Sequence, residues 1–97
     1  MSLRDPYLSK IDQFWDEILG MAELFTHIDP IIQFNVTTNK IKAYASKDYL
    51  GHLSDRTRES AKKQFKDAKA NGKFMMFVLD EVNRVHRSFI FDLENEE

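Results

Sequence analysis

Apolar positions in the first third of the chain follow a helical period. They recur at steps of three and four residues: Leu8, Ile11, Trp15, Ile18, Ala22 and Phe25. This spacing places them on one face of an amphipathic helix. Asp5 and Pro6 suit its start, because Asp accepts hydrogen bonds from free amides and Pro fits the first helical position. We predict one helix of about 20 residues, weakened or bent at Gly20 and ended before Pro30.

The following segment, "IIQFNVTTNKIKAYAS", changes to a period of two and predicts a β-hairpin. Ile32, Phe34 and Val36 form one face of its first strand. The turn falls at Thr38-Asn39, because Asn tolerates the left-handed conformation of tight turns. The returning strand is expected over residues 40–45. Residues 47–53 fit either a loop or a short helical turn, since Gly51 argues against one continuous helix.

A second helix is expected between Ser54 and the Asn71-Gly72 pair. Ser54 or Asp55 can cap its first amides, and Gly72 can adopt the left-handed conformation that ends helices. Its apolar stripe, Ala61, Phe65 and Ala68, is narrow and small. Such a stripe lets a helix lie close to a sheet.

The last segment predicts a second hairpin. Residues 74–79 are apolar at every position, and such a strand should be covered on both faces. Residues 80–83 supply the turn. Arg87 and Ile90 interrupt the alternation of the return strand. Residues 94–97 form an acidic tail that we expect to be solvated.

These elements predict one α+β domain over residues 1–97, in the order αββαββ. Two hairpins would form a four-stranded, mainly antiparallel sheet with two helices packed on it. "NKIKAY" and "NRVHRSF" follow the two turns at similar offsets. They suggest an αββ pseudo-repeat over residues 5–46 and 54–93, although two hairpins with similar turn chemistry would look the same.

Composition limits the function classes. The 97 residues are 42% hydrophobic and 31% charged, as in a packed globule with a solvated surface. A net charge of −2 predicts no general affinity for nucleic acid or anionic membranes. The absence of cysteine excludes disulfides and thiolate chemistry. No signal peptide or membrane span is recognisable, so we expect a cytoplasmic protein.

Charge is nevertheless unevenly distributed. Residues 54–73 carry seven basic and three acidic side chains, a balance of +4, which leaves −6 for the rest. On a helical wheel four of these cations line one flank: Arg58, Lys62, Lys66 and Lys69. A solvated face explains this ridge most simply, since Glu59 is placed to pair with neighbouring lysines. An acidic protein partner or nucleic-acid phosphates are the alternatives.

Other candidate chemistry is sparse. Strict alternation turns Arg87 toward the packed side, where it would anchor an anion, unless an edge position or bulge turns it outward. His27 and Asp29 need ligands such as His52 or Asp48 for a metal site, and no metal-binding spacing supports one. Ser88, His86 and Asp80 lack the context of a catalytic triad. We therefore predict no enzyme, no cofactor and no metal.

The sheet itself gives the strongest functional expectation. If both helices cover one face, a second copy of the chain is the most available cover for the other. We predict a small non-catalytic interaction or regulatory domain, self-associating as a homodimer or binding a protein partner through a sheet face or edge. The alternatives are a nucleic-acid-binding protein using the ridge and a small-ligand pocket around Arg87, His86 and Trp15.

Overall fold

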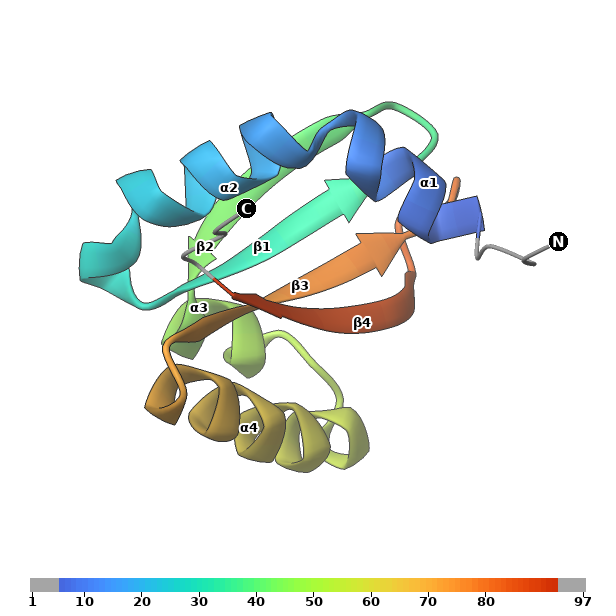
Figure 1. The fold of residues 1–97 in the computed structure, drawn as a ribbon. Helices are drawn as coiled ribbons and strands as arrows, with labels where there is room; N and C mark the ends of the chain where they lie inside the picture. The colour runs from blue at the N-terminus through green and yellow to red at the C-terminus, as the bar shows by residue number, and fades with distance from the viewer. Residues whose placement is uncertain (1–5, 93–97) are drawn as a thin grey trace, which may run out of the picture.

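The computed structural model describes residues 6–92, which form three layers with a sheet in the middle (Figure 1). The helices are α1 (Pro6–Gln13), α2 (Trp15–Leu24), α3 (Ser46–Gly51) and α4 (Asp55–Ala70), with a 3₁₀ helix η1 (Thr26–Ile28). The strands are β1 (Pro30–Asn35), β2 (Lys40–Ala45), β3 (Lys73–Leu79) and β4 (Val85–Asp92). The expectation of mixed helices with a four-stranded sheet is confirmed, but the element order differs from αββαββ.

The sheet is mixed, so the prediction of a mainly antiparallel sheet is wrong. Its order is β2-β1-β3-β4, with an antiparallel hairpin on each side and β1 parallel to β3 at its centre. Residues 47–53, which the sequence left ambiguous, lie in α3 and in a loop that carries the chain toward the far end of the sheet (Figure 1). Helix α4 then returns it to the end where β1 begins, and β3 must run parallel to β1.

The first predicted helix is interrupted at Phe14 rather than at Gly20. Phe14 has φ −110° and ψ 18°, outside the helical range. Its ring packs on Phe34 of β1, with centroids 5.8 Å apart. Packing against the sheet therefore decides where the helix breaks, while Gly20 lies inside α2 without a break.

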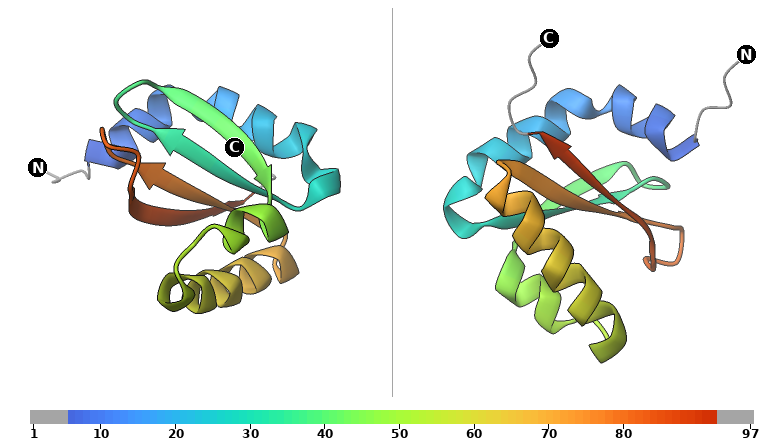
Figure 2. Two further views of the ribbon diagram at one scale, coloured as in Figure 1. Left: turned by 180° about the vertical axis from the view of Figure 1, so that it is seen from behind. Right: turned by 60° about the horizontal axis from the view of Figure 1, so that its bottom comes forward.

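Each face of the sheet has its own apolar core. Helices α1 and α2 cover the face that holds Ile32, Phe34, Phe74, Met76 and Val78. Helices α3 and α4 cover the face that holds Ile31, Met75 and Phe77, using Tyr49, Leu50 and Ala61. Burying each large apolar side chain contributes roughly 1.5–3 kcal/mol. Figure 2 shows the helices on both sides of the sheet.

Strand β3 is buried on both faces from Phe74 to Leu79, which confirms the prediction from its continuous apolar run. The condition on which a second copy was expected to cover a sheet face, both helices on one side, is not met. The same chain covers both sides of β3, because α3 and α4 lie between the two hairpins and cross to the second face. A bare sheet face therefore no longer argues for a homodimer, and only the sheet edges remain.

Local stop and turn signals are confirmed. Ser54 Oγ accepts a hydrogen bond from the Thr57 amide at 3.3 Å at the start of α4. Gly72 after α4 has φ 70°, and Asn39 and Asn83 in the two turns have φ 62° and 61°. These are the left-handed conformations that Gly and Asn tolerate.

Two expectations stay predictions. The αββ pseudo-repeat is untested, although the two hairpins lie symmetrically about the central parallel pair. The acidic tail, residues 94–97, lies outside the described residues. Within residues 6–92, no helix is long and apolar enough to cross a membrane.

Candidate interaction surfaces

Helix α4 is the basic element, and it packs on β3 through the predicted stripe. Ala61 and Ala68 are buried and Phe65 is half-buried. The small side chains bring the helix close to β3, so its two flanks face different surroundings. One flank faces α3 and the other faces β4.

Arg58, the first residue of the predicted ridge, is held by the chain itself. Its Nε donates to the Leu50 carbonyl at 3.0 Å and its Nη2 to the Leu53 carbonyl at 2.7 Å. Its Nη1 lies 2.7 Å from Asp55 Oδ1. The planar guanidinium thus ties the end of α3 and the following loop to α4. Arg58 has a structural task in this arrangement.

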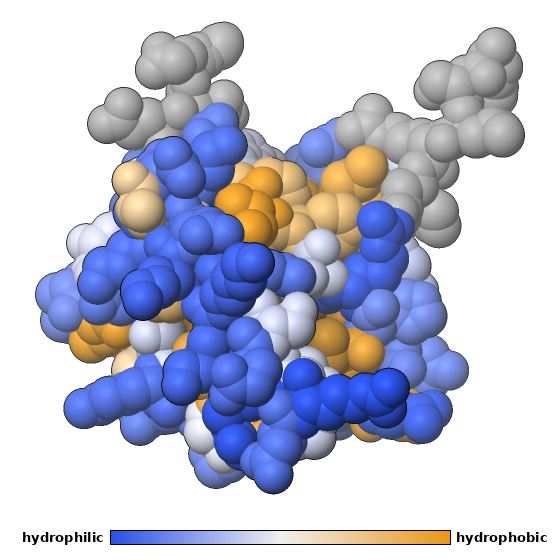
Figure 3. Space-filling model, turned by 90° about the horizontal axis from the view of Figure 1, so that it is seen from below, coloured by the Kyte–Doolittle hydropathy of each residue, from blue (hydrophilic) through white to orange (hydrophobic). Residues whose placement is uncertain are grey.

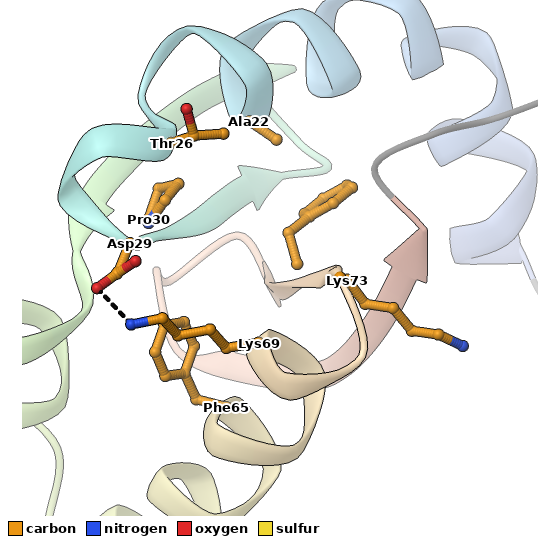
Figure 4. Close-up of a pocket in the computed structure, with 9 residues that line it drawn as sticks. Ala22, Thr26, Asp29, Pro30, Phe65, Lys69 and Lys73 are labelled. Carbon is orange, nitrogen blue, oxygen red and sulfur yellow. Dashed lines mark hydrogen bonds and ion pairs between the residues drawn. The ribbon is translucent and has the colours of Figure 1, made fainter.

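Lys69, at the other end of the ridge, forms an ion pair. Its Nζ lies 2.8 Å from Asp29 Oδ2, at the junction between η1 and β1. Figure 4 shows the two side chains meeting beside a small cavity of about 160 Å³. The cavity is lined by Ala22, Thr26, Asp29, Pro30, Phe65, Lys69, Gly72, Lys73 and Phe74. This volume lies below the roughly 300–1,000 Å³ typical of small-molecule sites.

Lys62 and Lys66 border an open groove of about 500 Å³ between α3 and α4. We call it the α3–α4 groove, lined by Leu50, Glu59, Lys62, Lys63, Phe65, Lys66 and Lys69. No described residue forms an ion pair with Lys62, Lys63 or Lys66. Leu50 and Phe65 give it an apolar floor. The structure therefore brings Lys62, Lys66 and Lys69 together, as the sequence predicted, but assigns Arg58 and Lys69 existing partners.

Arg87 lies on β4, an edge strand, and is exposed. The ladder between β3 and β4 is irregular at Val78 and Leu79, with Val78 opposite Arg87 and Leu79 opposite Val85. The bulge shifts Val85, while Arg87 stays in phase with Phe89, as strict alternation predicts. Arg87 is exposed because β4 is the edge strand, so it is not a buried anchor. Its guanidinium carbon lies 4.8 Å from the centre of the Phe89 ring, a cation–π contact.

The outer edge of β4 is a candidate interaction surface that the sequence pattern indicated only weakly. Within residues 6–92, β4 pairs only with β3, and Val85 and Ile90 are 40% and 39% exposed. Two hollows of about 200 and 400 Å³ follow the line between α4 and β4. We call this line the α4–β4 seam. Thr57, Ser60, Gln64, Val85, Ser88 and Ile90 line it together with the charged or titratable residues Asp67, Lys73, His86 and Arg87. Arg87 and Ile90, which broke the sequence alternation, were the available signal.

Figure 3 views this side of the molecule from below. Its surface is mostly hydrophilic, with hydrophobic patches exposed between the charged side chains. Such patches are common on protein surfaces. A patch that adjoins an unpaired edge strand is a candidate site for binding another chain.

Two of the candidate histidines lie against aromatic rings. His27 lies beside Phe25, with ring centroids 6.3 Å apart, while His86 packs on Tyr7 at 5.0 Å. Among residues 6–92, no cluster of three or more acidic or histidine side chains could hold a metal ion. Asp80 accepts hydrogen bonds from the Arg84 and Val82 amides, both at 3.0 Å. Those bonds, that of Arg84 foremost, hold the pKa of Asp80 below its ordinary value.

Tyr49 is the other group with a perturbed pKa. Burial on the α3 side of the sheet, aided by the neighbouring Tyr44, raises its pKa to about 12. Its ring stacks on Phe77 with centroids 5.2 Å apart. Tyr49 therefore belongs to the core.

Comparison of the whole chain with protein-family models, with curated proteins and with solved structures found no significant match.

Proposed function

We propose that this protein is a small, non-catalytic interaction domain that associates with a second copy through the outer edge of β4. The observation that supports this most directly is the edge itself. β4 is eight residues long, carries two exposed apolar side chains and borders an open seam. An exposed edge of this kind is a template for pairing with another strand.

The opposite edge, β2, is less suited to pairing. Lys40 and Lys42 are exposed on it, and lysine on edge strands opposes strand addition. Helix α2 also packs against β2. β4 instead presents Val85, Ser88 and Ile90 on its seam side.

The charge of α4 favours a second copy as the occupant of the seam. Thr57, Ser60 and Gln64, on the flank toward β4, are uncharged. Antiparallel pairing of two β4 strands about a two-fold axis would place both α4 helices on the same side of a continuous sheet. The two β3 strands would be about 14 Å apart, three strand spacings, so the flanks toward β4 would face each other. These flanks carry the uncharged residues and one acidic residue, Asp67, with Lys73 beside it. The lysine-rich flanks would point away and add little repulsion.

The oligomeric state tests this proposal. We expect sedimentation velocity to show a monomer–dimer equilibrium that shifts with protein concentration between about 1 and 200 µM, as mass action requires. Ile90→Lys puts a charge into the seam and should weaken dimerisation at least tenfold, or about 1.4 kcal/mol. Ile90→Thr keeps the β-branched shape and should weaken it less.

Leu24→Lys is the matched control. Leu24 is 68% exposed on α2, across the sheet from the seam, and its replacement should leave dimerisation unchanged. A strict monomer at about 200 µM would overturn the proposal, given the mass action involved. So would equal dissociation by Leu24→Lys, because the contact would then lie elsewhere.

A further inference from the structure

We propose a second, independent binding site: the α3–α4 groove accepts an acidic segment of a protein partner that carries a large apolar side chain. The groove combines an apolar floor, Leu50 and Phe65, with a rim of lysines. The apolar side chain of the segment would cover the floor, and its carboxylates would pair with Lys62 and Lys66.

Three lysines of the rim are available for a partner, because the contacts within the chain are made by other basic side chains. Arg58 is committed to the α3–α4 connection and Lys69 to Asp29. Lys62, Lys63 and Lys66 form no ion pair with a described residue. Glu59 also lines the groove, so these three lysines leave a local charge of about +2 there.

This size of charge favours a peptide over nucleic acid. Lys62 and Lys66 lie four residues apart on α4, about 6 Å along the helix axis. Proteins that bind duplex DNA tightly neutralise on the order of six to ten phosphates. Two or three lysines fall short of that number. Residues 6–28, which form the layer across the sheet, carry four acidic and one basic side chain, and this charge of −3 would repel a long polyanion.

The apolar floor of the groove also favours a peptide over nucleic acid. Among the described residues that line the groove, Phe65 is the one aromatic side chain, and it is half-buried. One half-buried ring is a poor platform for stacked bases. A carboxylate-bearing segment with a leucine or phenylalanine matches both parts of the groove. A plain polyanion matches only the rim.

Fluorescence anisotropy with three labelled probes tests the inference on the full chain. The probes are a synthetic peptide of glutamates and leucines, a polyglutamate peptide of equal charge, and a DNA duplex. We expect the mixed peptide to bind most tightly, at least tenfold above polyglutamate, and salt to weaken it. Tighter binding of DNA than of the mixed peptide would overturn the inference, as would no peptide binding at about 1 mM.

Two double variants locate the site. Lys62→Glu with Lys66→Glu should weaken binding of the mixed peptide at least tenfold. Lys40→Glu with Lys42→Glu makes the same change of charge on β2 and should alter affinity less than twofold. Equal losses in both would show a response to net charge alone, and the groove would be excluded as the site. Because neither pair lies in the α4–β4 seam, the result is independent of dimerisation.

Discussion

Asn35 Nδ2 donates a hydrogen bond to Asn83 Oδ1 at 2.8 Å, joining the end of β1 to the turn of the second hairpin across 48 residues. Asn35 is only 7% exposed, and its Oδ1 accepts the amides of Thr37 and Thr38 at 2.9 and 3.0 Å. One buried side chain therefore closes its own turn and holds the second turn against it. The two hairpins, which meet through the parallel pair, are fixed at this end of the sheet by a polar link.

Replacing Asn35 by Ala should destabilise the protein by about 1–3 kcal/mol, because backbone amides and Asn83 would lose their partner in a buried place. Chemical denaturation measures this loss. Asn83→Gly keeps the left-handed conformation and removes only the side-chain acceptor, so its cost should be about 1 kcal/mol or less. Equal costs for the two variants would contradict the central part assigned to Asn35.

Asp29 combines an ion pair with a strained backbone. It has φ 50° and ψ 68°, and its carboxylate pairs with Lys69 in a site where the two side chains are 47% and 58% exposed. Asn tolerates this conformation, so Asp29→Asn should lower the free energy of unfolding by no more than about 1 kcal/mol. This loss should be smaller at high salt, because salt screens the ion pair. Asp29→Ala should cost about 1–2 kcal/mol more, because Ala disfavours the left-handed region. Thermal unfolding at low and high salt separates the contribution of the ion pair from that of the backbone conformation. Similar losses in both variants would show that the backbone conformation matters little.

Arg58 should matter for stability more than its place in a basic ridge suggests. Arg58→Lys keeps the charge but cannot reach the Leu50 and Leu53 carbonyls in the same planar geometry. We expect a loss of about 1.5–3 kcal/mol, measured by denaturant unfolding. Arg56→Lys, on the exposed side of the same helix, should change stability by less than about 0.5 kcal/mol. If Arg58→Lys left the free energy of unfolding unchanged, Arg58 would not be needed for the fold. It would then be available to bind a partner.

The raised pKa of Tyr49 predicts that the protein loses stability at alkaline pH. Its pKa is raised to about 12 in the folded protein, so folding favours the neutral phenol. The stabilisation is complete below about pH 10, the pKa of a free tyrosine, and declines as pH rises from there toward about 12. Each pH unit in this interval should remove up to about 1.4 kcal/mol. Denaturant unfolding across alkaline pH should show a shallower decline in Tyr49→Phe than in the wild type. Identical profiles would rule out Tyr49 as the source.

The candidate sites were predictable only in part. The period of the basic segment placed Lys62, Lys66 and Lys69 on one flank, and that placement is correct. The partners of Arg58 were not predictable, because Leu50 and Leu53 belong to a segment that fitted either a loop or a short helical turn. Alternation correctly placed Arg87 on the same side of β4 as Phe89. Its exposure depends on the position of β4 at the edge of the sheet, which the pattern of one strand does not contain.

What the sequence determined by itself is the four strands, the basic helix α4, and the turn and stop signals between them. Ser54, Gly72, Asn39 and Asn83 act within a few residues of the chain, through capping bonds or a left-handed backbone, so their effects are visible locally. The unbroken apolar run of β3 likewise required cover on both faces. Tertiary structure decided which elements supply that cover, the parallel pairing of β1 with β3, and the break at Phe14. Those outcomes follow from side chains far apart in sequence that compete to be buried on two faces of one sheet, and no local pattern records that competition.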